Sequence, residues 1–325
     1  MIRTAFFCLL TSVAALAVTE EKINKQFTVQ SGGTLVVDID FGAIEVSANT
    51  SGNNEVIVDI SRKVSRKHKA DEEAFLKERP ITFSQDGNTL TIRSLRQSKK
   101  PWSWSGWSQN EAKYTIAVPP QFNTQLKTSG GGIGIQNLAG DSKAHTSGGG
   151  LRFTHLRGPL NGDTSGGGIH VTDCEGTIKI HTSGGGIQVE GGSGSIDGHT
   201  SGGSVTVKNF GGPARVDTSR GGITIEKVAG KVEGTTSGGS ISAVLPSPLP
   251  GDVKLSTSGG GVTVRIPEDA AFQLDAHTSS GAATSELPVN AIEKTERNRL
   301  NGTVNGGGKT VFLRSSGGGI RIKRL

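Results

Sequence analysis

Apolar and polar residues alternate over short stretches from residue 128 onward, and these stretches recur every 18 residues. The clearest marker of the repeat is Thr-Ser-Gly-Gly-Gly or a close variant, which begins at Thr128, Thr146, Thr164, Thr182, Thr200, Thr218 and Thr236. Two further copies begin at Thr257 and Thr278, 21 residues apart, and a last copy begins at Ser315. Self-similarity at a fixed short period is typical of a solenoid, in which each repeat stacks on the next.

Within each repeat, two apolar positions separated by one polar or small residue indicate a short strand with one buried face. The first column contains Ile133, Leu151, Ile169, Ile187, Val205, Ile223 and Ile241, and the second contains Ile135, Phe153, Val171, Val189, Val207, Ile225 and Ala243. A later apolar column, which predicts a second strand, contains Leu160, Ile178, Ile196, Ala214 and Val232. Glycine, with 49 residues in the chain, recurs between these strands, where the backbone must turn a corner.

The columns predict an all-β fold: a β-solenoid of about ten stacked coils of 18–21 residues, with two short strands per coil. The strands of one coil cannot satisfy all their backbone groups internally, so we expect parallel pairing from coil to coil, with Ile169 stacked on Ile187. The threonine column should then form a ladder of hydroxyl groups. At ~4.8 Å per coil, the rod would be roughly 50 Å long.

Residues 1–17 are predicted to be a signal peptide for export. Arg3 supplies a positive start, Ala5 to Leu16 is an apolar core, and the sequence ending at Ala17 fits a small-residue cleavage site. The apolar run is short for a membrane span, although a retained N-terminal anchor is the alternative. We therefore expect an exported protein, located in the periplasm, at the cell surface or outside the cell, with no transmembrane span after signal removal.

Two regions are predicted after the signal. Residues 18–123 form a degenerate solenoid and hairpin region: residues 42–46 resemble the repeat strand at 221–225, the charged segment 63–79 indicates a short helix or a loop, and residues 81–84 and 89–94 read as a hairpin. Residues 124–325 form the regular solenoid with a C-terminal cap. The charges of Arg321, Lys323 and Arg324 in the last coil are expected to protect an open end of the stack from further pairing.

The number and distribution of charged residues indicate which classes of partner to expect. Without Arg3 the chain has 34 basic and 29 acidic residues, and this excess is scattered over outward positions, so we expect no nucleic-acid partner.

Loss of the signal also removes Cys8, which leaves Cys174 as the one cysteine and rules out an internal disulfide. Because Cys174 lies in an apolar column, we interpret it as a core residue rather than a reactive thiol.

The repeated Thr-Ser-Gly-Gly-Gly-Ile-x-Val unit, the early Gly-x-Ile-x-Val segment and the final Ser-Ser-Gly-Gly-Gly-Ile-Arg-Ile resemble the bacterial putative-adhesin family. The resemblance covers about residues 30–325. It implies a β-solenoid domain of unknown function, and it brings no catalytic or binding residues with it.

One candidate partner-binding site is the loop that contains Trp102, Trp104 and Trp107, every tryptophan of the chain. The three rings lie within six residues, and tryptophan stacks on sugars and is enriched at binding hot spots. The alternative is that the rings fold back and cover the apolar end of the solenoid. A partner would be a surface glycan, another envelope component or another protein.

A second candidate is the outward column immediately before the repeat threonine, which contains His145, Asp163, His181, His199 and Asp217. Neighbouring coils would place these side chains about 5 Å apart. His181 and His199 could then share a metal ion with Asp163 or Asp217, but a line of ligands is unlike the tetrahedral set that zinc prefers. A solvated polar ladder is the favoured interpretation, and we expect no cofactor.

The sequence therefore predicts a non-enzymatic, exported, adhesin-like or cell-envelope scaffold and binding protein. The alternative is a carbohydrate-active enzyme on a β-helix scaffold, similar to a polysaccharide lyase. Such enzymes gather Asp, Lys and Arg on one wide face, whereas the charged residues of these repeats do not collect around one proton-abstracting base.

Overall fold

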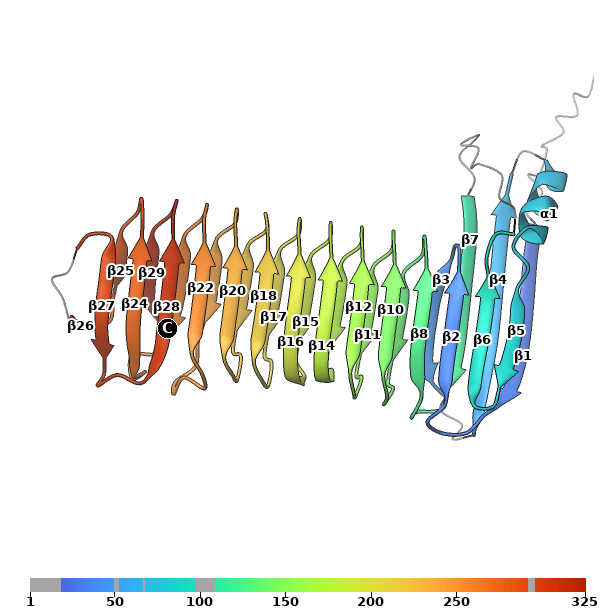
Figure 1. The fold of residues 1–325 in the computed structure, drawn as a ribbon, viewed down its shortest axis with the longest axis horizontal. Coiled ribbons are helices and arrows are strands. Elements are labelled where there is room, and N and C mark those ends of the chain that lie inside the picture. The colour runs from blue at the N-terminus through green and yellow to red at the C-terminus, as the bar shows by residue number, and fades with distance from the viewer. Residues whose placement is uncertain (1–18, 50–52, 67, 98–108, 292–295) are drawn as a thin grey trace, which may run out of the picture.

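The structure is a computed structural model that describes residues 19–49, 53–66, 68–97, 109–291 and 296–325. Two large β-sheets run along the length of a rod, and one short helix lies at its N-terminal end (Figure 1). The predicted signal peptide and the loop of Trp102, Trp104 and Trp107 lie outside the described residues.

Sheet A contains one of the two strands of each regular coil. Its strands, in spatial order, are β1 (Thr19–Thr28), β4 (Glu55–Ser65), β7 (Gln109–Val118), β3 (Ala43–Ala48), β9 (Ile133–Gln136), β11 (Leu151–Thr154), β13 (Ile169–Thr172), β15 (Ile187–Glu190), β17 (Val205–Lys208), β19 (Ile223–Glu226), β21 (Ile241–Val244), β23 (Val262–Ile266), β29 (Ile320–Arg324) and β25 (Ala283–Ser285).

Sheet B contains the other strand of each coil. Its strands, in spatial order from the opposite end, are β26 (Asn290–Ala291), β27 (Arg299–Val304), β24 (Phe272–Thr278), β28 (Lys309–Ser315), β22 (Val253–Thr257), β20 (Val232–Thr236), β18 (Ala214–Thr218), β16 (Ser193–Thr200), β14 (Glu175–Thr182), β12 (Leu160–Thr164), β10 (Ser142–Thr146), β8 (Asn123–Thr128), β2 (Thr34–Ile39), β6 (Thr89–Ser94) and β5 (Thr82–Asp86).

Parallel pairing between successive coils holds the middle of the rod together. Ile169 of β13 pairs with Ile187 of β15, and Ile178 of β14 pairs with Ile196 of β16, in each case 18 residues further along. These side chains point between the two sheets and are almost completely buried. The predicted all-β fold with parallel coil-to-coil pairing and the stacking of Ile169 on Ile187 are confirmed.

The threonine column makes a different ladder from the expected one. Thr164 and Thr182 are in register, but their hydroxyl groups do not bond to each other. The Thr182 hydroxyl donates to the carbonyl oxygen of Gly167 in the preceding coil at 2.8 Å and accepts from the N–H of Gly185 in its own corner at 3.2 Å. Each buried threonine therefore ties one glycine corner to the next, which satisfies backbone groups that the turn would otherwise leave unpaired.

The glycine three residues after each repeat threonine is required by the closeness of the coils. A Cβ on Gly185 would lie 2.1 Å from the carbonyl oxygen of Gly167, and a Cβ on Gly203 would lie 2.1 Å from that of Gly185. The preceding glycine of the same corner is less crowded, because a Cβ on Gly184 would lie 3.4 Å from its nearest neighbours. The repeat thus needs glycine where backbone passes over backbone at the corner.

The N-terminal end of the rod is closed by antiparallel strands. The first coil, β2 and β3, lies between later segments, because β2 pairs with both β6 and β8 and β3 pairs with both β7 and β9. Beyond this coil, β1, β4 and β7 pair antiparallel in sheet A, and β5 and β6 form an antiparallel hairpin in sheet B. The hairpin was predicted, and helix α1 (Lys69–Lys77) falls within the predicted charged segment.

The C-terminal end corrects one expectation. The last coil, β28 and β29, is not the open end of the stack: β28 lies between β22 and β24, and β29 lies between β23 and β25. Figure 1 places the C-terminus beside β28, inside the row of strands. The prediction that Arg321, Lys323 and Arg324 protect an open end is therefore wrong. Instead, β24 pairs antiparallel with β27, and the chain then returns to fill the place beside β22, where Val311 matches Val253.

A buried polar cluster connects helix α1 to the N-terminal strands. The buried carboxylate of Glu72 accepts hydrogen bonds from the Thr19 hydroxyl at 2.6 Å, the Thr19 N–H at 3.1 Å and the Arg66 N–H at 2.8 Å. The bond from the Thr19 hydroxyl contributes most to lowering the pKa of Glu72 below its ordinary value, followed by the bond from Arg66.

Nearby, the buried Arg62 donates to the Arg79 carbonyl oxygen at 2.7 Å and forms an ion pair with Glu21. These contacts hold β1 against the closed end.

We predict that Gly185→Ala destabilises the protein by about 3 kcal/mol, because a methyl group at this position overpacks the backbone of the neighbouring coil. Gly184→Ala, one residue earlier, should change the free energy of unfolding much less. Urea unfolding followed by circular dichroism measures both variants. Equal destabilisation by the two substitutions would contradict the assignment of the crowded position.

We predict that Glu72→Gln lowers stability at neutral pH and that its deficit shrinks in acid. Since the folded state lowers the pKa of Glu72, the carboxylate stabilises the fold above its unfolded pKa, and this contribution is lost as pH falls through the folded pKa. Melting temperatures of the wild type and the variant should therefore converge with decreasing pH. The matched control is Glu73→Gln on the exposed side of α1, for which no such convergence is expected.

Candidate binding groove on sheet B

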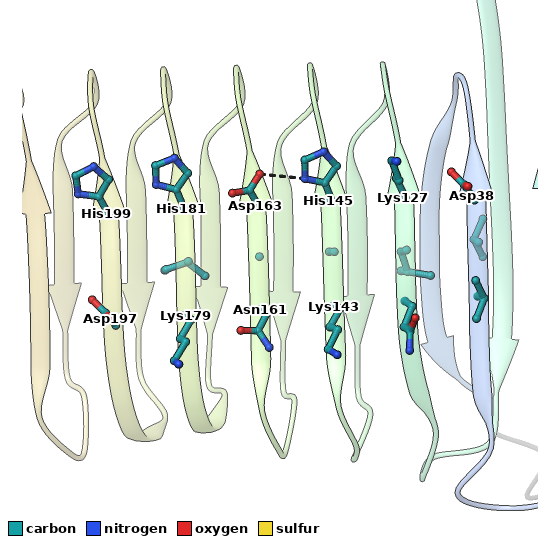
Figure 2. Close-up of a pocket in the computed structure, with 17 residues that line it drawn as sticks. Asp38, Lys127, Lys143, His145, Asn161, Asp163, Lys179, His181, Asp197 and His199 are labelled. Carbon is teal, nitrogen blue, oxygen red and sulfur yellow. Dashed lines mark ion pairs between the residues drawn. The ribbon is translucent and has the colours of Figure 1, made fainter. Parts of the chain in front are cut away.

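A groove of about 650 Å³ crosses the outer face of sheet B over β2, β8, β10, β12, β14 and β16. Two rows of outward side chains form its walls (Figure 2). We call one the histidine row: Asp38, Lys127, His145, Asp163, His181 and His199. We call the other the lysine row: Val36, Gln125, Lys143, Asn161, Lys179 and Asp197.

The strand alternation explains why these residues point outward. On each strand the two row positions are two residues apart, and the residue between them points into the core, as Ala144 does between Lys143 and His145. In-register pairing then aligns each row across the strands, since His145 pairs with Lys127 on one side and with Asp163 on the other. The groove is thus the surface consequence of the same repeat that builds the core.

The floor of the groove is backbone, supported from below by the core. Gly162 occupies the inward position on β12, and a Cβ there would lie 2.8 Å from the ring of Phe153 on sheet A. The Phe153 ring therefore packs directly beneath the β12 backbone, and it is completely buried. A floor of hydrogen-bonded strands over packed rings keeps the two rows at a constant separation.

The histidine row contains one ion pair and one pair of parallel rings. His145 Nδ1 lies 3.0 Å from Asp163 Oδ1, and both side chains are about half exposed. The rings of His181 and His199 are parallel to within 4°, with centroids 5.2 Å apart. All four residues present polar atoms along one line that follows the rod axis (Figure 2).

Three lysines contribute free positive charge. Lys127, Lys143 and Lys179 are exposed, and none of them forms an ion pair with another described residue. Lys143 is flanked in register by Gln125 and Asn161, whereas Lys127 pairs across the strands with Asp38 and Lys179 pairs with Asp197. Since neither of these two pairs forms an ion pair, all three exposed ammonium groups can contact a ligand.

An ion pair marks the end of the groove beyond β16. On β18 the two outward positions are Arg215 and Asp217, and Arg215 Nε lies 3.6 Å from Asp217 Oδ2. This contact joins the line of the lysine row to the line of the histidine row. On β18 the Arg215–Asp217 contact crosses the space between the two rows, which is open on β10, β12 and β14.

Four of the five residues of the predicted polar ladder lie in the groove. The structure brings His145, Asp163, His181 and His199 together in the groove, whereas Asp217 lies just beyond it. Within the described residues, no three His, Cys, Asp or Glu side chains are arranged so that they could hold a metal ion. Lys127, Lys143, Asn161, Lys179 and Asp197 were not predicted as groove residues. Lys127 belongs to the histidine column itself, and the signal for the other four was a second polar column two residues before it.

Most of the chain matches the model of one known family. Residues 36–323 match the family described as Toastrack DUF4097. The chain belongs to the Toastrack family. The description of this family names no activity. None of the curated proteins matches this chain.

Several solved structures are similar to this Toastrack chain. One is described as a putative cell adhesion protein from Clostridium sporogenes, with 11% identity, coverage of 94% of this chain and 100% of the other, and a TM-score of 0.25. A putative adhesin from Bacteroides fragilis has 14% identity, coverage of 94% and 97%, and a TM-score of 0.28. A putative lipid binding protein from Parabacteroides distasonis has 10% identity, coverage of 94% and 96%, and a TM-score of 0.29.

No helix in the described part of the chain is long and apolar enough to cross a membrane.

Cys174 lies outside the groove and is the free cysteine among the described residues. It is buried, its Sγ lies 3.4 Å from the Thr172 carbonyl oxygen, and burial raises the pKa of the thiol to about 11. Its position agrees with its interpretation as a core residue.

We predict that Cys174 does not react with a thiol reagent in the native protein at pH 8, because its thiol is buried and protonated. In the Cys8→Ser variant, which leaves Cys174 as the one cysteine, absorbance with an aromatic disulfide reagent should rise only after guanidinium is added. Rapid stoichiometric labelling without denaturant would contradict the buried assignment.

Proposed function

We propose that this Toastrack protein is an exported, non-enzymatic, adhesin-like binding protein of the cell envelope, and that the groove on sheet B is its contact surface. The observation that carries the proposal is the pair of polar rows that follows the rod axis over six strands. A site of this form fits an extended ligand, because the same type of contact recurs at each strand along one direction.

The chemistry of the groove supports binding rather than turnover. Catalytic sites hold different groups in a converging arrangement around one reacting atom. Here the polar groups are displaced from one another by about one strand spacing, ~4.8 Å, along parallel rows. Among the residues that line the groove there is no Ser, Thr, Cys or Tyr that could serve as a nucleophile or a phenolic acid.

Export is supported by the sequence of residues 1–17, which has the three parts of a signal peptide. The segment of Trp102, Trp104 and Trp107 follows β6 and precedes β7 in the sequence, and it is proposed as a second contact. A regular rod with a binding groove along one face suits a protein that spans a distance between envelope components.

The experiment that tests the proposal blocks the groove without touching the core. Asn161 is exposed at the centre of the lysine row, and Asn161→Trp should fill the space between the rows. Binding of labelled protein to isolated cell envelopes should weaken about tenfold, as expected for obstruction of a central contact. Fractionation of the producing cells should place the wild-type protein outside the cytoplasm.

The matched control is Gln188→Trp, an exposed outward position on β15 of sheet A, far from the groove. It should bind envelopes as the wild type does. Loss of binding in both variants would point to unfolding, which circular dichroism detects. Full binding by a folded Asn161→Trp variant would refute the groove as the contact surface.

A further inference from the structure

The charged groups of the groove carry information about the ligand beyond its extended shape. Lys143 and Lys179 lie in the same row, separated by Asn161 on the intervening strand. Two strand spacings place them about 10 Å apart, twice ~4.8 Å. This distance is comparable with one disaccharide of an extended β-linked chain, so two anionic groups on alternate sugars would each meet a lysine.

Around the two lysines, the groove presents hydrogen-bond groups suited to neutral sugars. Asn161, between the lysines, offers both a donor and an acceptor, and the carboxylates of Asp163 on the same strand and of Asp197 beside Lys179 are acceptors for hydroxyl groups. Lys127 in the histidine row adds a third cation on the opposite wall. The mixture of isolated cations with acceptors matches a polymer that is rich in hydroxyls and carries intermittent negative charge.

The same mixture disfavours a nucleic acid. A nucleic acid strand bears a phosphate on every nucleotide, and Asp38, Asp163 and Asp197 would repel such a continuous charge. Proteins that bind single strands also stack bases on aromatic side chains. No Phe, Tyr or Trp is among the residues that line the groove.

A lipid surface fits the described residues less well. Binding at a bilayer interface uses apolar side chains that insert among the acyl chains. Within the described segments, the large apolar residues that are exposed are Leu95 and Leu325, and neither lies in the groove. The groove walls are formed by side chains with polar ends at almost every position.

We infer that the groove binds a linear acidic polysaccharide, aligned with the rod axis, in which carboxylate or similar anionic groups on alternate sugars contact Lys143 and Lys179. This inference rests on the proposed function and adds the ligand class and the orientation. Lys127 would contact an anionic or hydroxyl group from the other wall, and Asn161 would contact the intervening sugar.

The test uses the full protein and oligomers of hyaluronan, a β-linked chain with a carboxylate on alternate sugars, as the acidic probe, with neutral oligomers of β-linked glucose for comparison. Fluorescence anisotropy should show binding of the acidic oligomer that weakens with added salt, and much weaker binding of the neutral one. The Lys143→Gln/Lys179→Gln variant should bind about fivefold to tenfold more weakly, as expected for loss of two exposed charge contacts.

Two variants keep the result interpretable. Lys254→Gln changes an exposed lysine on β22 that continues the line of the lysine row but lies outside the groove, and its affinity should equal that of the wild type. Lys143→Arg/Lys179→Arg should retain most of the affinity, since it preserves both charges. An equal loss in Lys254→Gln would show nonspecific attraction and would overturn the inference.

Other outcomes separate this inference from the proposed function. Tighter binding of a single-stranded oligodeoxynucleotide or of phosphatidylglycerol vesicles than of the hyaluronan oligomers would overturn the ligand class. If the protein does not bind the hyaluronan oligomers while Asn161→Trp still loses envelope binding, the inference fails and the proposed function stands. Formation of unsaturated uronate during incubation would show a lyase and would refute the non-enzymatic proposal.

Discussion

The backbone hydrogen bonds between successive coils are the interaction on which this structure depends. They fix the spacing of neighbouring strands at ~4.8 Å, and every other part of the repeat must fit that spacing. At the corners the fit requires a residue without Cβ, as at Gly185, which lies against the Gly167 carbonyl. In the same corners, the threonine hydroxyls form hydrogen bonds with backbone groups that the turn itself does not pair. The Thr182 hydroxyl donates to the carbonyl oxygen of Gly167 and accepts from the N–H of Gly185.

A stack held by this interaction must be stopped at both ends, since an exposed parallel edge would accept another chain. Strand reversal stops it at three of the four sheet edges. At the N-terminal end, β6 and β7 pair parallel with the coil of β2 and β3, and β5 and β4 then pair antiparallel with β6 and β7. At the C-terminal end, β27 pairs antiparallel with β24 in sheet B, whereas sheet A ends at the short parallel strand β25.

The repeat also shapes the candidate site. Translation along the rod places chemically related side chains in straight rows, and straight rows suit a ligand that is itself extended. The groove exists where both rows on sheet B remain open, and it ends where Arg215 and Asp217 join across the gap. Local differences among otherwise similar coils, rather than the repeat itself, thus select the part of the surface that can bind.

Local pattern was sufficient to predict much of this protein. The two-residue alternation placed Ile169 and Ile187 in the core, the 18-residue period placed them in register, and the turn residues between 84 and 89 predicted the hairpin. The outward position of His145, Asp163, His181 and His199 also followed from alternation. All of these properties depend on residues close in sequence or on exact repetition, which a single sequence displays directly.

The tertiary structure decided what repetition leaves open. Nothing local in β28 and β29 says that they insert between β22–β23 and β24–β25, because parallel strands with similar apolar columns can pair in either order. The partners of the threonine hydroxyls depended on how closely the corners approach. The groove depended on whether Arg215 bridges to Asp217 while Lys143 and Lys179 stay free, and such side-chain contacts are set only when the strands are assembled.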